Sequence, residues 1–118
     1  MAGLTTHVLD VANGCPAPGL SIALYTLSAD HGEAWIRTAS TNADGRTDEP
    51  MLLPSETKPG IYELRFDVGA YFAGKGQADS EHPFLGVVPV RFAISDTARH
   101  YHVPLLVAPW SYTTYRGS

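Results

Sequence analysis

The sequence is poor in several features on which particular functions depend. Among its 118 residues Cys15 is the only cysteine, which excludes an intrachain disulfide and is typical of a reducing compartment. Eight basic against twelve acidic residues give a formal charge of −4, so the basic stripe of nucleic-acid-binding proteins is missing. No apolar run reaches membrane-spanning length, and Met1-Ala2-Gly3 does not begin a signal peptide. We therefore expect a cytoplasmic protein with no nucleic-acid or membrane partner.

Motifs of several enzyme and metal-binding classes are missing too. The chain has no glycine-rich phosphate loop, no serine nucleophile elbow and no paired-carboxylate signature. Cys15 lies among turn residues with no histidine beside it, which favours a structural cysteine over a nucleophile. His100 and His102 would share one face of a strand, as zinc ligands can, but neither Cys15 nor His82 adds a third ligand at a metal-motif spacing. We therefore predict no metal site.

The overall composition is typical of one small globular domain. Hydrophobic residues make up 44% of the chain and charged residues 17%, as in folded proteins rather than disordered ones. A chain of this size buries about two thirds of its unfolded surface, which permits a core without disulfides or metals. We therefore expect residues 1–118 to form a single domain.

Short alternating segments predict strands along nearly the whole chain. The clearest is 61–66, where apolar residues on one face alternate with charged residues on the other. One short helix is expected over 68–75, with Asp67 as its N-cap. Pro89 and Pro104 fall inside two predicted strands, and each requires an edge, a bulge or an unpaired position because proline cannot donate to a ladder. The predicted strands are 4–11, 20–27, 33–38, 61–66, 87–95, 101–107 and 111–115. This pattern is typical of an all-β sandwich of two antiparallel sheets with one short helix.

Five residues could contribute chemistry, although each also has an ordinary structural explanation. His7 and His102 each lie on a half-apolar strand face, where a histidine is more often structural than catalytic. Arg46 follows a tight Asp-Gly turn, either as a solvated charge or as a cation that binds a developing anion. Tyr115 and Arg116 either end the last strand or stack on and hydrogen-bond a planar polar ligand. Taken singly, none of these residues decides between the alternatives.

Four segments taken together are more specific. They are Leu4-Thr5-Thr6-His7-Val8-Leu9-Asp10, Asp44-Gly45-Arg46-Thr47, Tyr101-His102-Val103-Pro104-Leu105-Leu106 and the terminal Tyr115-Arg116-Gly117-Ser118. With these segments the chain resembles, over essentially its whole length, the transthyretin-like hydrolases that open 5-hydroxyisourate.

The resemblance implies a set of site residues. In that family the corresponding histidines, arginine and terminal tetrapeptide form the active site. Within that set we assign His102 as the base for water and His7 as its partner in orienting water or passing the proton, with the exchange of these two roles as the alternative. Arg46 would bind the polar ring and stabilise negative charge. Ser111 and Thr113, polar residues of the last strand, could line the same pocket. The substrate-binding residues expected on this basis are Tyr115, Arg116, Gly117, Ser118, Ser111 and Thr113.

The resemblance also implies a reaction and an assembly. The fold would be similar to transthyretin, the subunits would form a homotetramer, and the sites would lie between dimers. The small-molecule substrate would be 5-hydroxyisourate, the product of urate oxidation in purine degradation, and no cofactor would be needed.

Two other functions are compatible with such a fold. A transthyretin-type carrier could bind a small aromatic ligand without catalysis, but a carrier has no need to keep His7, Arg46, His102 and the Arg116-Gly117-Ser118 ending together. A carbohydrate-binding or adhesive module is a weaker alternative, since only Trp35 and Trp110 are candidates for the exposed aromatic residues of such modules.

Overall fold

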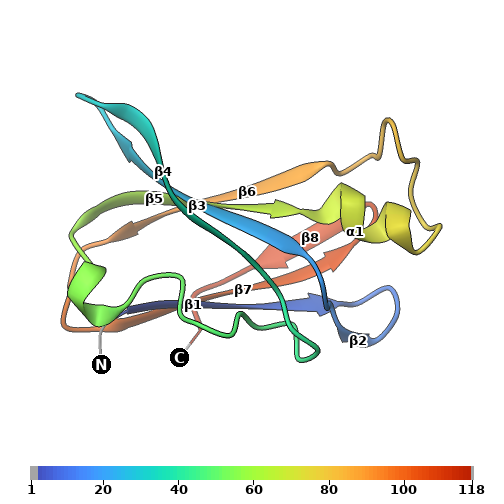
Figure 1. Cartoon of the computed structure of the whole chain (residues 1–118), viewed down its shortest axis with the longest axis horizontal. Coiled ribbons are helices and arrows are strands. Elements are labelled where there is room, and N and C mark those ends of the chain that lie inside the picture. Colours follow the sequence, from blue (N-terminus) through green and yellow to red (C-terminus); the bar gives the residue numbers. More distant parts are fainter. Residues whose placement is uncertain (1–2, 118) are drawn as a thin grey trace.

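The two sheets of the protein pack face to face as the layers of a sandwich. A computed structural model describes residues 3–117. Figure 1 shows β1, β7 and β8 in one layer and β3, β5 and β6 in the other, with helix α1 at one end. The first sheet has the strand order β2-β1-β7-β8 and the second has β4-β3-β5-β6. The predicted sandwich with one short helix is therefore confirmed.

The elements follow the predicted segments closely. The strands are β1 (Gly3–Asp10), β2 (Cys15–Pro16), β3 (Ser21–Ser28), β4 (Gly32–Ser40), β5 (Gly60–Asp67), β6 (Val87–Ile94), β7 (His100–Ala108) and β8 (Ser111–Thr114). The helices are the 3-10 turn η1 (Pro54–Glu56) and α1 (Val68–Gly74). The sequence predicts a turn where β2 forms, and this two-residue strand pairs with the end of β1. Within residues 3–117 no helix is long and apolar enough to cross a membrane.

One strand pairing differs from the antiparallel arrangement that the sequence predicts. Strands β1 and β7 run parallel, with Leu4 opposite Tyr101 and Asp10 opposite Val107. The chain between them builds the whole of the second sheet and then returns, so β7 enters the first sheet in the same direction as β1. The other strand pairs are antiparallel.

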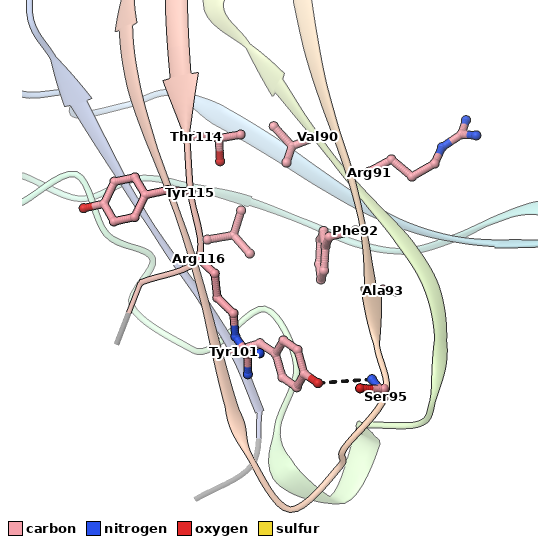
Figure 2. Close-up of a pocket in the computed structure, with 10 residues that line it drawn as sticks. Val90, Arg91, Phe92, Ala93, Ser95, Tyr101, Thr114, Tyr115 and Arg116 are labelled. Atoms are coloured by element: carbon pink, nitrogen blue, oxygen red, sulfur yellow. Dashed lines mark hydrogen bonds between the residues drawn. The ribbon is translucent and has the colours of Figure 1, made fainter.

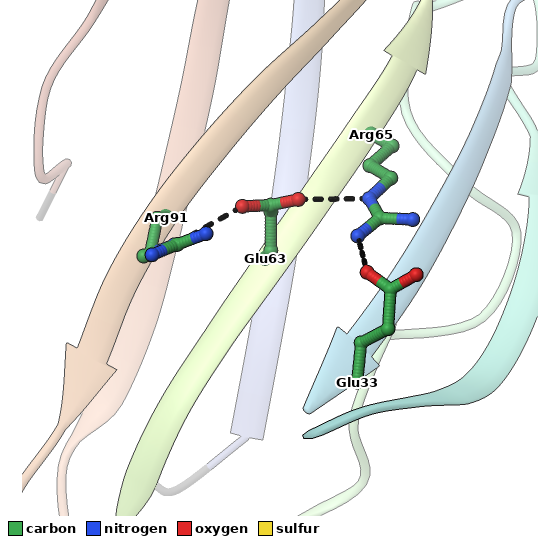
Figure 3. Close-up of polar contacts among 4 residues, drawn as sticks. All are labelled: Glu33, Glu63, Arg65 and Arg91. Atoms are coloured by element: carbon green, nitrogen blue, oxygen red, sulfur yellow. Dashed lines mark hydrogen bonds and ion pairs between the residues drawn. The ribbon is translucent and has the colours of Figure 1, made fainter. Parts of the chain in front are cut away.

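Alternation along each strand produces the core between the layers. In β5 the side chains of Leu64 and Phe66 are fully buried, and they face those of Val8 and Leu105 from the first sheet within one apolar cluster. On the outer side of the second sheet Glu63 accepts hydrogen bonds from two arginines, one of which also pairs with Glu33; Figure 3 shows these four residues, Glu33, Glu63, Arg65 and Arg91. The predicted division of 61–66 into an apolar and a charged face is confirmed.

The prolines lie where a missing N–H can be tolerated. Pro89 is in β6, at the edge of its sheet. Pro104 is in the central strand β7, and the ladder between β7 and β8 stops opposite it: pairing ends at Thr114 and resumes at Gly117, which lies opposite His102. The Thr114 hydroxyl instead donates to the Pro104 carbonyl, at 2.8 Å. The break separates the residues after β8 from regular strand pairing.

A polar cluster joins helix α1 to the end of β1. Asp10 is buried, and its carboxylate accepts hydrogen bonds from the Tyr71 hydroxyl at 2.7 Å and from the backbone and side chain of Asn13. Burial opposes ionisation, but these hydrogen bonds outweigh it and hold the pKa of Asp10 below its usual value. At the start of α1 the amide of Ala70 donates to Asp67, so the predicted N-cap is confirmed.

Candidate active site

The candidate site lies on the outer face of the first sheet, where β1 and β7 run side by side. Thr5 stands opposite His102 in the parallel register, and His7 stands opposite Pro104. Their neighbours Leu4, Val8, Tyr101 and Val103 are buried in the core. Because side chains alternate along a strand, Thr5, His7, His100 and His102 point away from the core, and all four are partly exposed. The fold thus brings the two predicted histidines onto one open face.

The His102 ring is held by the Thr5 hydroxyl. Thr5 Oγ1 lies 2.8 Å from His102 Nδ1 and 2.9 Å from His100 Nε2. A hydroxyl donates a single hydrogen, so one imidazole nitrogen accepts that hydrogen and the other donates its N–H to the oxygen. Among residues 3–117, no group is hydrogen-bonded to His102 Nε2. The ring is therefore oriented through one nitrogen and presents the other to the open face.

His102 is biased toward its neutral form. Burial lowers the pKa of its imidazole, and the positive charges of Arg46, His100 and His7 lower it further. A neutral imidazole can accept a proton at physiological pH.

His7 is held by the turn that precedes Arg46. Its Nε2 donates to the Asp44 carbonyl oxygen at 2.8 Å. The Asn42 side chain accepts from the Asp44 amide at 2.9 Å, and Gly45 continues the turn with a φ of 76°. A side chain at Gly45 would lie 2.3 Å from the Val8 carbonyl, so only glycine allows the turn to pack this closely on β1. In the neutral ring, Nδ1 of His7 is then the nitrogen that can accept a proton.

Arg46 leaves this turn directly beside His7. The two residues form an isolated antiparallel bridge, which places the arginine at the edge of β1. Arg46 is exposed and forms no ion pair with any residue that the structure describes. It borders a depression of about 240 Å³ that is otherwise lined by Thr5, Thr6, Thr47, Asp48 and Pro50. Its charge is therefore available to an anionic group near the histidines.

The C-terminal segment returns to the site through Gly117. Its amide donates to the His102 carbonyl at 2.8 Å. A Cβ at Gly117 would lie 2.6 Å from His102 Cδ2, so the glycine backbone packs directly on the imidazole. Ser118 lies outside the described residues.

Within residues 3–117, the other predicted binding residues form no hydrogen bond with the histidines. Tyr115 is exposed, and Figure 2 shows its ring directed away from the pocket between the sheets. Arg116 points to the opposite side of its sheet from His102, where its guanidinium lies 4.1 Å from the centre of the Tyr101 ring. Ser111 and Thr113 pair with Ala108 and Leu106, further along the outer face, and both are exposed.

Comparison with known proteins shows the family of this chain. Residues 4–117 match the family described as HIUase/Transthyretin. The chain belongs to that family. It is 51% identical over 116 residues to the 5-hydroxyisourate hydrolase of Halalkalibacterium halodurans, covering 98% of this chain and 97% of that protein. It is 50% identical over 117 residues to the 5-hydroxyisourate hydrolase of Mus musculus, covering 98% and 94%. The resemblance stated from the sequence is confirmed.

Solved structures similar to this chain include both a 5-hydroxyisourate hydrolase and a transthyretin in complex with thyroxine. Klebsiella pneumoniae 5-hydroxyisourate hydrolase superimposes with a TM-score of 0.79 at 31% identity, covering 100% of this chain and 94% of that one. Sea bream transthyretin in complex with thyroxine superimposes with a TM-score of 0.87 at 31% identity, covering 97% and 93%. The backbone fold therefore does not distinguish a hydrolase from a protein that binds thyroxine, so the side chains of the site must do so.

The structure reveals contacts of two further residues that the sequence did not indicate. Thr5 orients His102, and Tyr101 contacts Arg116. The sequence shows only that Thr5 shares a face with His7. Its position opposite His102 depends on the parallel register of β1 and β7, for which the sequence gives no signal.

Proposed function

We propose that this protein is an enzyme that hydrolyses 5-hydroxyisourate, in the degradation of urate. The proposal rests on one observation above all: His102, held by Thr5 and with its pKa lowered by burial, shares an open face with His7, beside which Arg46 lies. Relatives named 5-hydroxyisourate hydrolase, 51% and 50% identical to this chain over nearly its full length, support the same activity.

The reaction opens a cyclic amide-like bond by adding water. His102 accepts a proton from water at Nε2, which requires that its Nδ1–H donates to Thr5 and that the Thr5 hydroxyl donates to His100. The hydroxide attacks the ring carbonyl carbon, and the charge that develops on the oxygen is stabilised by the Arg46 guanidinium. The carbon–nitrogen bond then breaks, and the leaving nitrogen takes up the proton that His102 accepted from water, which returns the imidazole to its neutral form.

His7 is the second proton-transfer group in this proposal. Its Nε2–H is engaged by the Asp44 carbonyl, so Nδ1 is the atom that orients water or passes the proton to the leaving nitrogen. Tyr115 and Gly117 of the terminal segment, with Ser111 and Thr113 of β8, would border the substrate on the same side, together with Ser118, which lies outside the described residues. Arg116 belongs to the same segment but points to the opposite side of the sheet. The residues proposed for catalysis remain His7, Arg46 and His102, and no cofactor enters these steps.

The assembly, the domain and the compartment are part of the same proposal. A homotetramer would cover the open face of the first sheet, where the site residues are half exposed, and sedimentation under assay conditions would test it. A fully active monomer would contradict it.

We further propose a single domain over residues 1–118, in accordance with the family match over 4–117, and a cytoplasmic enzyme, in accordance with the lone cysteine.

The decisive experiment is direct. The protein is added to freshly generated 5-hydroxyisourate, and the ultraviolet decay of the substrate is compared with its spontaneous decay. Acceleration that depends on enzyme concentration supports the hydrolase. Binding of a small aromatic ligand without any acceleration would favour the transthyretin-type carrier instead.

A further inference from the structure

Arg116 contacts a residue on the side of the sheet that faces away from the histidines. Its guanidinium lies 4.1 Å from the centre of the Tyr101 ring, in the geometry of a cation–π contact. Figure 2 shows the arginine directed at Tyr101 in the pocket between the two sheets. Because the register places Gly117 opposite His102, Arg116 falls on the inner side of the sheet. A side chain on that side does not reach a substrate bound beside the histidines.

The Tyr101 side chain is held in place by burial and by hydrogen bonds to its hydroxyl. Its side chain is buried, and its hydroxyl oxygen accepts hydrogen bonds from the amides of Ser95 and Asp96, at 3.1 and 3.2 Å. The Asp96 and Ser95 donors, together with the Arg116 charge, lower the pKa of Tyr101 to about 8. The ring is therefore fixed at both its strand and its hydroxyl, and an arginine that stacks on it is fixed in turn.

The residue after Arg116 contacts the catalytic imidazole. The Gly117 amide donates to the His102 carbonyl, and its Cα is packed so closely on the ring that a Cβ would lie 2.6 Å from Cδ2. Regular pairing with β7 is broken between Thr114 and Gly117, opposite Pro104. The backbone ladder alone therefore does not hold Gly117 in place, and the stack of Arg116 on Tyr101 supplies a second anchor.

We propose that Arg116 is a positioning residue, which by stacking on Tyr101 holds Gly117 against the His102 ring and does not itself contact substrate. This inference deepens the proposed function and, as far as catalysis is concerned, rests on it. It also assigns Arg116 a different task from the substrate contact that the resemblance implied.

The test compares matched variants of the full-length chain. Arg116→Met removes the charge and keeps an unbranched chain; we expect kcat to fall about tenfold while KM changes less than about twofold. Tyr101→Phe keeps the ring, so its kcat should stay within about twofold of the wild type. Tyr101→Leu removes the ring and should reproduce the loss, and the double variant Arg116→Met/Tyr101→Leu should lose no more than either single one.

Arg91→Gln is the control. Arg91 borders the same pocket but is directed away from it and bonds Glu63, so its removal should leave kcat and KM unchanged. Melting temperatures are measured for every variant, and activities are compared only among folded proteins.

A second measurement does not depend on turnover. The imidazole resonances of His102 are followed by NMR as a function of pH in the wild type, Arg116→Met and Arg91→Gln. Loosening of Gly117 should expose the ring, so the titration midpoint of His102 should rise in Arg116→Met, because burial is the main cause of its low pKa. Arg91→Gln should leave the midpoint where it is.

Three outcomes would overturn the inference. One is a rise of about tenfold or more in KM at unchanged kcat for Arg116→Met, which would make Arg116 a substrate-binding residue. Another is a strictly additive double variant. The third is an unaltered His102 titration in Arg116→Met. If the wild type does not hydrolyse 5-hydroxyisourate at all, the proposed function fails, and the NMR comparison alone decides whether Arg116 positions His102.

Discussion

The Thr5 hydroxyl and the His102 imidazole, ninety-seven residues apart in the chain, are hydrogen-bonded at 2.8 Å across the parallel pair of β1 and β7. The same hydroxyl contacts His100 at 2.9 Å. It therefore connects two imidazoles and determines which nitrogen of His102 faces the open side of the sheet. The orientation of the proposed base depends on a residue that has no acid–base chemistry of its own.

Thr5→Val should reduce activity without disturbing the fold. The substitution removes the hydroxyl at nearly constant volume, so the His102 ring loses its orientation, and we expect kcat to fall about tenfold. Thr6→Val is the matched control, because the Thr6 hydroxyl donates to the Val103 carbonyl in the core. That variant should lose about 1 kcal/mol of stability and keep its kcat. Equal kcat values for Thr5→Val and wild type would show that the contact does not orient a catalytic group.

His102→Asn and His7→Asn should each lower kcat by about 10²-fold or more, the usual scale for a positioned acid or base. Both changes are nearly volume-conserving and lie on a partly exposed face, so the melting temperature should change little. His31→Asn, in the exposed turn between β3 and β4, is the control for the substitution itself. A histidine whose variant retains the wild-type rate is structural, and its assignment is then wrong.

The pH dependence of kcat/KM should report the environment of His102. If neutral His102 accepts the proton, kcat/KM rises with pH as the imidazole loses its charge. The midpoint should lie below the ordinary histidine value of about 6.5, because burial and the positive charge of Arg46 lower this pKa.

Arg46→Gln separates the effect of the Arg46 charge on the pKa of His102 from the effect of burial. Removal of the guanidinium charge should shift the acidic limb to higher pH and lower the plateau of kcat/KM, since the developing oxyanion loses its cation. An acidic limb at the same pH in both proteins would mean that His102 is not the titrating base.

Asp10 should make stability depend on pH at the acidic end. Its pKa is lower in the folded protein than in the unfolded chain, so the ionised carboxylate contributes stability above about pH 4 and loses it as the pH falls through the folded value. Asp10→Asn removes this contribution. The free energy of unfolding, measured by urea titration between about pH 6 and pH 2, should therefore fall less steeply for the variant than for the wild type. Parallel curves for the two proteins would contradict this account.

The strands and the core could be predicted from the sequence because they depend on local alternation. In β5, apolar and charged residues alternate over 61–66, and the structure buries the apolar set in the core. The Asp67 cap marks the start of α1 in the same local way. The short strand β2 could not be predicted, since Cys15 and Pro16 have no strand pattern and pair only because the end of β1 lies beside them.

The sequence by itself determined the sandwich and the family and singled out His7, Arg46 and His102 as candidate site residues, because alternation and motifs are properties of neighbouring residues. The tertiary structure alone decided how these residues meet. The parallel register of β1 and β7 places Thr5 opposite His102, and it arises only because the chain completes a second sheet before it returns. The return of the C-terminal segment places Gly117 on the His102 ring and turns Arg116 inward to Tyr101. Pairing between distant segments selects one register among many, and no local pattern specifies which one.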